Sequence, residues 1–218
     1  MAKKAIILGI TGLVGDALSR KLLKDDNYSE VISVHRRKSK IDHPKLTEMI
    51  GSIDALEEPL NADVVFCCIG TTQQKTSDKE QYRAIDYGIP LQAAQYCKAQ
   101  NIPTLIVISA LGANPDSNAF YMRLKGEMER DVLKVGVKNT YFMQPSLIAG
   151  DREEKRFLEK MGVVLMKIMN PFMWGPLKKY RSIHPDAIAA AMIAVDKNGY
   201  EKARIPSDQI QKLADVTY

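Results

Sequence analysis

The sequence has few cysteines and no long apolar stretch, and both features narrow the class of protein. Three of its 218 residues are Cys, which favours a reducing compartment, so we expect a cytoplasmic protein. Cys67 and Cys68 are adjacent and have no second pair at metal-ligand spacing, so we expect no metal site. No apolar run approaches the roughly 20 residues of a membrane-spanning helix. The start of the chain shows no cleavage pattern, so we expect neither a membrane segment nor a signal peptide.

The chain is basic but has no dense basic stripe. Its formal net charge is +5 and its isoelectric point is about 9.0. One local cluster stands out, His35-Arg36-Arg37-Lys38-Ser39-Lys40, and the other basic residues are spread along the chain. Nucleic-acid-binding surfaces usually combine a denser stripe with interleaved aromatic residues. We therefore expect a solvated surface for most of this charge and no nucleic-acid partner.

Apolar runs alternate with helical patterns along most of the chain, and 45 % of the residues are hydrophobic. Such an alternation predicts a Rossmann-like α/β domain, with a doubly wound parallel sheet and right-handed crossovers. We expect one domain over residues 1–218. The composition shifts after Gly150, so residues 151–182 form a candidate substrate-covering segment, a small C-terminal lobe. The alternative for this segment is a surface helix packed on the core. The apolar runs are Ala5–Leu8, Val31–Val34, Asp63–Ile69, Pro103–Ser109 and Thr140–Met143.

Three glycines follow the first apolar run at the spacing G-x-x-G-x-x-G, a variant of the dinucleotide-binding fingerprint. Glycines at a strand-to-helix turn let backbone N–H groups approach an anion, and the helix N-terminus adds partial positive charge. The alternative is a tight turn without a ligand. The predicted cofactor-binding residues of this loop are Gly9, Thr11, Gly12, Leu13, Val14 and Gly15.

The end of the second strand predicts which dinucleotide binds. An NAD site usually places Asp or Glu there to hold the ribose 2′-hydroxyl. This chain has His35, Arg36 and Arg37 instead, and guanidinium groups suit a 2′-phosphate through charge-assisted hydrogen bonds. We therefore expect NADP (NADPH) rather than NAD. The alternative is an exposed basic loop.

Ser109, Tyr121 and Lys125 are the candidate catalytic residues. Ser109 closes a strand, where its hydroxyl can hydrogen-bond a substrate carbonyl. Tyr121 and Lys125 are four residues apart, so they share one face of a helix. A phenol has a pKa near 10, and a neighbouring ammonium group favours its ionised form, which suits proton exchange near neutral pH. Lys125 would also bind the nicotinamide ribose.

With these motifs the chain resembles the short-chain dehydrogenase/reductase superfamily in its atypical branch. It looks most similar to the small NADPH-binding oxidoreductases related to the Tat-interacting tumour-suppressor protein. The resemblance covers almost the whole chain. It implies that Cys68, Gly70 and Thr71 lie along the cofactor, and that the backbone at Pro145 and Ser146 meets the nicotinamide carboxamide. The residues that carry it are the three glycines, Cys67-Cys68-Ile69-Gly70-Thr71-Thr72, Ser109, Tyr121–Glu127, Gln144-Pro145-Ser146 and Ile183–Ala189.

The chain departs from this family pattern at several positions. Ser52 stands where many relatives have an Asp that contacts adenine, and Asp86 where many have an Asn that supports a proton relay. Gln144 and Ser146 replace the usual Arg and Gly.

Three functions stay open. The first is an NADP-dependent oxidoreductase acting on a small carbonyl or alcohol substrate, as a monomer or homodimer. The second is a redox-sensing regulator that binds NADP(H) and a protein partner, with little or no turnover. The third is a sugar-nucleotide epimerase or another non-redox use of the fold, and the short segment after Gly150 leaves little room for a nucleotide-sugar lobe.

Overall fold

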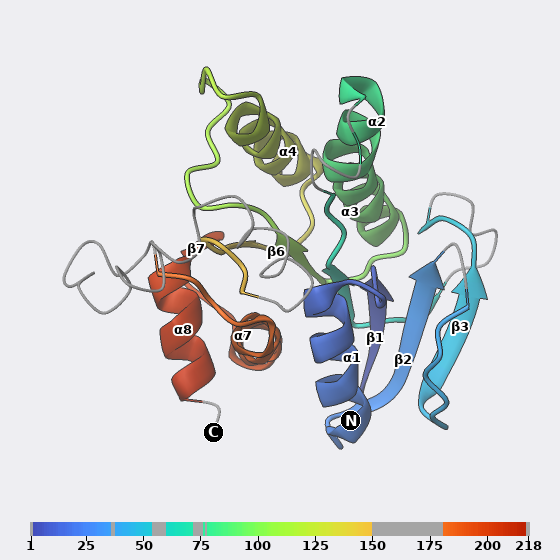
Figure 1. Ribbon diagram of the computed structural model, residues 1–218. Helices are drawn as coiled ribbons and strands as arrows, with labels where there is room; N and C mark the ends of the chain where they lie inside the picture. Colours follow the sequence, from blue (N-terminus) through green and yellow to red (C-terminus); the bar gives the residue numbers. More distant parts are fainter. Residues whose placement is uncertain are drawn as a thin grey trace.

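The computed structural model describes residues 2–35, 38–53, 60–71, 76, 78–149 and 181–216. Their centre is a seven-stranded sheet in the order β3-β2-β1-β4-β5-β6-β7 (Figure 1), and every neighbouring pair is parallel. This architecture confirms the predicted Rossmann-like sheet. The strands are β1 (Lys3–Leu8), β2 (Tyr28–His35), β3 (Leu46–Ile50), β4 (Val64–Cys67), β5 (Thr104–Ile108), β6 (Asn139–Gln144) and β7 (Arg204–Pro206).

Helices cover both faces of the sheet (Figure 1). On one face lie α1 (Leu13–Lys24), α7 (Pro185–Asn198) and α8 (Ser207–Asp215). On the other face lie α3 (Ile89–Ala99) and α4 (Phe120–Val135). A short helix α2 (Lys79–Arg83) and a π-helical turn, η2 (Ala84–Gly88), lead directly into α3.

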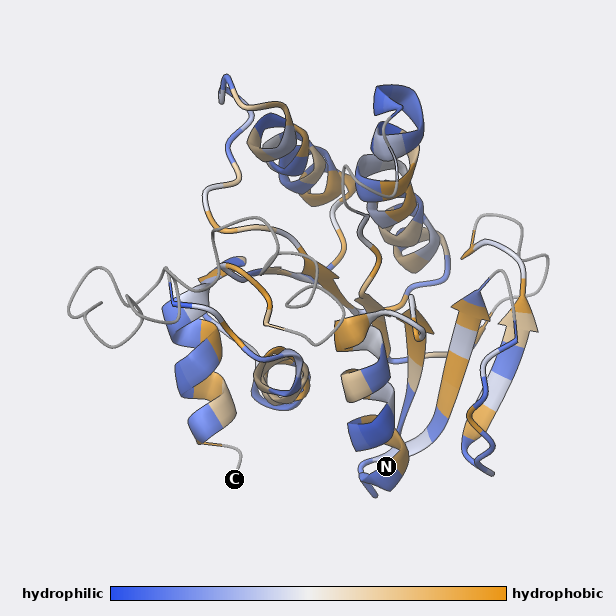
Figure 2. Ribbon diagram, viewed as in Figure 1, coloured by the Kyte–Doolittle hydropathy of each residue, from blue (hydrophilic) through white to orange (hydrophobic). Residues whose placement is uncertain are grey.

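The two hydrophobic cores follow from the alternation of side chains along each strand. On β1, Ile7 packs with the α1 and α7 side, whereas Ile6 and Leu8 pack with the α3 and α4 side. Because both faces are covered, the central strands carry unbroken apolar stretches, as parallel strands usually do: Ala5–Leu8 in β1, Val64–Cys67 in β4 and Leu105–Ile108 in β5. Figure 2 shows this as hydrophobic central strands, beneath helices whose outer faces are hydrophilic.

The sheet order reverses between β1 and β4, which are neighbours although β2 and β3 separate them in the chain. In open α/β sheets, ligands bind in the crevice outside the carboxyl ends of the strands at such a switch point. The glycine loop follows β1 and the segment Cys68–Thr71 follows β4, so both lie at this place.

Beyond β6, residues 147–149 pair with Ile183, on the other side of the range 150–180 that the structure does not describe. Ile148 forms a parallel bridge with Ile183, supported by bonds from the N–H of Ala149 to the carbonyl of Ile183 and from the N–H of Ile183 to that of Leu147. The candidate substrate-covering segment 151–182 lies outside the described residues except for Arg181 and Ser182. Its role stays a prediction.

Within the described ranges, no helix is long and apolar enough to cross a membrane. The same residues hold no cluster of three or more His, Cys, Asp or Glu side chains that could bind a metal ion.

Candidate dinucleotide-binding and catalytic site

The glycine loop is packed too tightly for side chains at two of its three glycines. Gly9 has a φ of +87°, and a Cβ there would lie 2.9 Å from the carbonyl oxygen of Cys68. A Cβ on Gly15 would lie only 2.0 Å from the carbonyl oxygen of Gly9. The loop therefore lies directly against the end of β4 and against the first turn of α1.

The N-terminus of α1 has no side-chain cap. Gly12 occupies the cap position, and its own N–H donates to Gly9 at 3.0 Å. The N–H groups of the next residues, Leu13, Val14 and Gly15, belong to the first turn, where a helix supplies no acceptor of its own. Thr11 is exposed, whereas the Val14 side chain is buried. Val14 can therefore contact a ligand only through its backbone N–H group. A cradle that has no room for a Cβ, at an uncapped helix start, suits a pyrophosphate.

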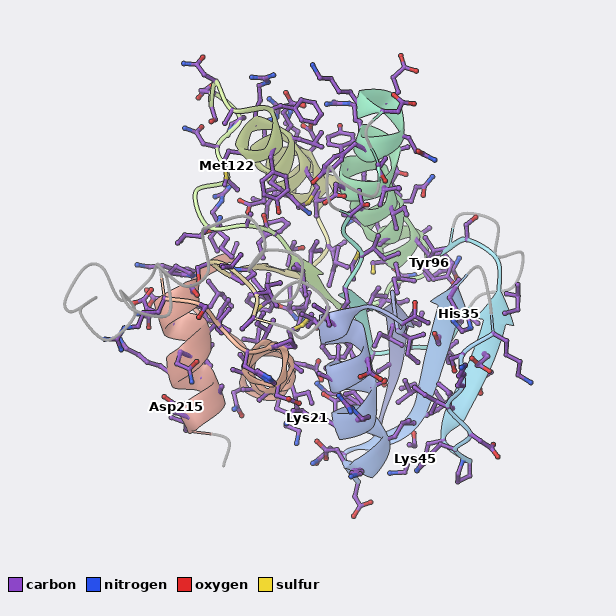
Figure 3. The ribbon with its side chains drawn as sticks, in the orientation of Figure 1. Lys21, His35, Lys45, Tyr96, Met122 and Asp215 are labelled. Atoms are coloured by element: carbon purple, nitrogen blue, oxygen red, sulfur yellow. The ribbon has the colours of Figure 1, made fainter. Side chains whose placement is uncertain are left out.

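His35 ends β2 and faces β3 rather than standing free (Figure 3). Its Nε2 lies 3.2 Å from Glu48 Oε1, and both side chains are largely buried. The same carboxylate oxygen accepts the backbone N–H of Ser39 at 2.7 Å. Hydrogen bonding from Ser39 holds the pKa of Glu48 below its usual value despite burial. Sequence reasoning did not identify Glu48. Arg36 and Arg37 lie outside the described residues, so the choice of NADP over NAD stays a prediction.

Lys125 is buried in an ion pair with Asp86. Nζ lies 2.8 Å from Asp86 Oδ1, and the two side chains are 2 % and 1 % exposed. The other oxygen of Asp86 accepts the N–H of Thr71 at 2.8 Å. Burial acts to lower the pKa of Lys125, but the neighbouring Tyr121 and Asp86 outweigh it and raise that pKa. Asp86 thus connects the segment after β4 with the lysine, and it lies in the π-helical turn, a feature frequent at functional sites.

Tyr121 lies in the first turn of the same helix and is half-buried. Its ring meets the ring of Tyr82 edge to face, with centroids 6.3 Å apart, and the Tyr82 hydroxyl donates to the carbonyl of Thr71 at 3.0 Å. The predicted shared face of Tyr121 and Lys125 is consistent with their positions on α4 and with their electrostatic interaction. Gly70 is exposed and Cys68 half-buried, at the same carboxyl end of the sheet.

Gly126 fixes the distance between α4 and the loop after β5. A Cβ there would lie 2.2 Å from backbone atoms of Asn114 and Pro115. The N–H of Asn114 also donates to the carbonyl of Met122 at 3.0 Å. The helix that carries Tyr121 therefore has a backbone-to-backbone contact that sequence reasoning did not anticipate, although a Gly directly after the lysine was a signal for it.

Ser109 lies at the predicted strand end, but its hydroxyl faces α4. Ser109 is 3 % exposed, and its Oγ donates to Glu129 Oε1 at 2.5 Å. Glu129 is fully buried and was not identified from the sequence. It also accepts a bond from Gln144 Nε2 at 2.9 Å and forms an ion pair with Arg204 Nε at 2.6 Å. Binding of a substrate oxygen by Ser109 stays a prediction.

Pro145 and Ser146 follow β6 at the same end of the sheet. The Pro145 carbonyl accepts the N–H of Leu111. The Ser146 hydroxyl donates to the carbonyl of Arg181 and lies 3.1 Å from the Ser207 hydroxyl. Ser146 therefore joins the end of β6 to the start of α8, and its carboxamide-binding role stays a prediction.

A parallel sheet with a glycine cradle at its switch point and a Tyr–Lys pair beside it defines a dinucleotide-binding protein of the Rossmann type. Residues 5–194 match the model of the NAD dependent epimerase/dehydratase family. The chain belongs to this family, which confirms the resemblance at the level of the superfamily. The narrower likeness to the Tat-interacting group stays a prediction.

Fungal proteins are among the curated relatives. The chain is 29 % identical over 228 residues to "Protein FMP52-1, mitochondrial" of Scheffersomyces stipitis, covering 98 % of this chain and 96 % of that one. It is 31 % identical over 165 residues to "Protein FMP52, mitochondrial" of Candida albicans, covering 70 % of each. These names contradict the predicted cytoplasmic location. A low cysteine content indicates a reducing environment, and it does not distinguish one reducing compartment from another.

Solved structures share the fold at low identity. A UDP-N-acetylglucosamine 4-epimerase from Methanobrevibacter ruminantium superposes with a TM-score of 0.69 at 16 % identity, over 97 % of this chain and 80 % of that chain. A short chain dehydrogenase family protein from Francisella tularensis gives 0.63 at 14 % identity, over 91 % and 93 %. The enzyme WbmF of Bordetella bronchiseptica, solved with NAD+, gives 0.67 at 14 %, over 99 % and 78 %.

Proposed function

We propose that the protein is an NADP-dependent oxidoreductase that interconverts a small carbonyl compound and its alcohol. The observation that carries this proposal is the buried Lys125, which interacts with Tyr121 and is held by Asp86 next to the segment after β4. A family defined by NAD dependence supports a nicotinamide dinucleotide, and the basic end of β2 favours its 2′-phosphorylated form.

The residues at the switch point fit this cofactor. The N–H groups of Leu13, Val14 and Gly15 would hold the pyrophosphate, because no side chain caps this helix start. Arg36 and Arg37 would hold the 2′-phosphate. When bound, the nicotinamide supplies or accepts a hydride.

The proton in this reaction would move at the Tyr121 hydroxyl. In carbonyl reduction Tyr121 donates its proton to the substrate oxygen, and in alcohol oxidation it takes that proton back. Lys125 keeps a positive charge beside the phenol, since its pKa is raised, and an ammonium group stabilises a phenolate. Asp86 fixes the direction of that ammonium group through its bond to the Thr71 backbone.

Tyr121→Phe tests the assignment because it removes one hydroxyl and keeps the ring. Positioned acid–base catalysis is worth about 10²–10⁴-fold, so we expect kcat with a carbonyl substrate to fall by that amount while NADPH binds as in wild type. Tyr141→Phe is the matched control, since the Tyr141 hydroxyl accepts only from the backbone of Tyr200 beyond α7 in the described contacts. Full activity of Tyr121→Phe would refute the catalytic role.

Calorimetric titration with NADPH and NADH tests the cofactor separately. We expect tighter binding of NADPH, and loss of that preference in the Arg36→Ala, Arg37→Ala double variant, since a charged hydrogen bond contributes about 1.5–3 kcal/mol. Equal or stronger NADH binding would contradict the proposal.

A cofactor-sensing regulator with little turnover is the second candidate. It is favoured by the Ser109 hydroxyl, which donates inward to Glu129 rather than into the crevice, and by the Asp86 carboxylate, which offsets the charge of Lys125. If wild-type protein turns over no carbonyl or alcohol, but binds a protein partner only in its NADPH form, this function replaces the first.

A further inference from the structure

Glu129 is a buried carboxylate that accepts bonds from three separate parts of the sheet. It lies in the middle of α4 and is 0 % exposed. Its Oε1 accepts from Ser109, directly after β5, and from Gln144, the last residue of β6. Its Oε2 pairs with Arg204, the first residue of β7. One side chain therefore joins α4 to three adjacent strands.

The bond from Ser109 to Glu129 determines whether the serine hydroxyl can still donate a hydrogen bond to a substrate. A serine hydroxyl carries a single proton, and here it points to a carboxylate that is buried and acts only as an acceptor when ionised. Such charge-assisted O–H···O bonds are short and about twice as strong as neutral ones. Turning the hydroxyl to a substrate oxygen would leave Glu129 with one donor fewer inside the protein, at a cost in free energy.

Arg204 places a positive charge directly against the buried Glu129 carboxylate. Its guanidinium Nε reaches the buried oxygen at 2.6 Å while the rest of the side chain is half-exposed. A buried charge is tolerated when it is paired and its remaining lone pairs are hydrogen-bonded, and Glu129 meets both conditions. Gln144 stands where the family pattern described in the sequence analysis has an Arg. The cation that pairs with Glu129 is Arg204 of β7, which lies 60 residues later in the chain.

We propose that Ser109 is a positioning residue rather than a substrate ligand. Its proton is committed to Glu129, and the cluster of Ser109, Glu129, Gln144 and Arg204 fixes α4 against the carboxyl ends of β5 and β6 and against the first residue of β7. In the reaction proposed above, on which this inference rests, Tyr121 is then the proton donor to the substrate oxygen without help from the Ser109 hydroxyl.

Proton NMR of the full chain tests the committed hydroxyl without any turnover. A serine hydroxyl in a buried bond to a carboxylate exchanges slowly with water, so we expect a hydroxyl resonance that disappears in Ser109→Ala. The proposal requires that this resonance persists when NADPH saturates the protein. It must also persist when an alcohol is then added and binds. Its absence in the free protein, or its loss on ligand binding, would overturn the proposal.

Urea unfolding of the free protein gives a second measurement. Ser109→Ala should raise the equilibrium constant for unfolding by about tenfold or more, as expected when a bond to a charged group is lost. In a Glu129→Gln background the same substitution should raise that constant by less. Ser33→Ala is the matched control, because Ser33 is fully buried in β2 and its Oγ has no hydrogen-bond partner within the described residues. It should show a smaller change, of similar size in both backgrounds. Equal effects of the two serine substitutions would count against the cluster.

Turnover then separates this inference from the proposed function. If wild type reduces a carbonyl substrate, Ser109→Ala should keep kcat within about tenfold, whereas Tyr121→Phe loses about 10²–10⁴-fold. A loss in Ser109→Ala as large as that in Tyr121→Phe, with unchanged KM, would make Ser109 a substrate ligand. If wild type shows no turnover, the proposed function fails, and the NMR result still decides the role of Ser109.

Discussion

Replacing Gly15 with alanine places a methyl group where the first turn of α1 meets the glycine loop. The new Cβ would lie 2.0 Å from the Gly9 carbonyl oxygen and 2.8 Å from its carbon, whereas ordinary contacts begin at 3.4 Å. Both neighbouring atoms belong to the backbone, so no side chain can turn away. The loop and the helix must separate by more than about 1 Å, an overpacking that typically costs about 1–3 kcal/mol of stability.

The displacement moves the N–H groups that would hold the pyrophosphate. Losing one hydrogen bond to a charged group costs about 1.5–3 kcal/mol, so the Kd for NADPH should rise about 10- to 100-fold. Calorimetric titration gives the affinity and thermal unfolding gives the stability. Gly88→Ala is the control, because the Cβ at that helical position meets nothing nearer than the Arg83 carbonyl at 3.9 Å. If Gly15→Ala binds NADPH and unfolds like Gly88→Ala, the loop is not the cofactor cradle described above.

Two other predictions concern the neighbouring helix and the thiols. Gly126→Ala would place its Cβ 2.2 Å from backbone atoms of Asn114 and Pro115, in the loop that precedes α4. We therefore expect a lower melting temperature and at least about a tenfold loss of turnover, measured against the same Gly88→Ala control. Burial raises the pKa of Cys67 to about 11 and that of Cys97 to about 12, so both thiols stay protonated in the folded protein at pH 8. Iodoacetamide should therefore label them only after unfolding in urea, and mass spectrometry of the native protein showing either one alkylated would contradict this.

The central strands could be predicted because they are buried on both sides. β1, β4 and β5 each contain an apolar run of at least four residues rich in Ile and Val, which is typical of strands buried on both faces. β3 is an edge strand whose five residues are only partly buried or exposed, so no apolar run marks it. β7 has three residues, too few for any periodicity.

The residue types of the site were predictable for a similar local reason. A glycine loop after a strand and a Tyr–Lys pair on one helix face are patterns within a few residues of each other. The residues with which the site residues pair, by contrast, lie far away in the sequence. Glu129 meets Arg204 across 75 residues and Lys125 meets Asp86 across 39. Such pairs depend on which strands are neighbours in the sheet, and local periodicity contains no information about that order.

The same long-range contacts determine that the Ser109 hydroxyl donates to Glu129, which the sequence around Ser109 does not reveal. A serine at the carboxyl end of a strand can point to the crevice or to a flanking helix, and the sequence around it is compatible with both. The direction is set by Glu129, two helical turns beyond Tyr121, together with a cation from β7. Pattern reasoning identified the strand end correctly but had no means of detecting a carboxylate beneath it.

The position of α4 is determined by charge as well as by apolar packing. Its inner face carries Lys125 and Glu129, one helical turn apart, and each is paired with an opposite charge from another element, Asp86 and Arg204. Apolar contacts are non-directional, so a helix held by them alone can slide or rotate slightly at low cost. Leaving a buried charge without its partner is strongly destabilising, so the pairing of buried Lys125 with Asp86 and of buried Glu129 with the half-exposed Arg204 restricts the register of α4. Since Tyr121 lies one turn before Lys125, the two pairs also restrict the position of the Tyr121 backbone.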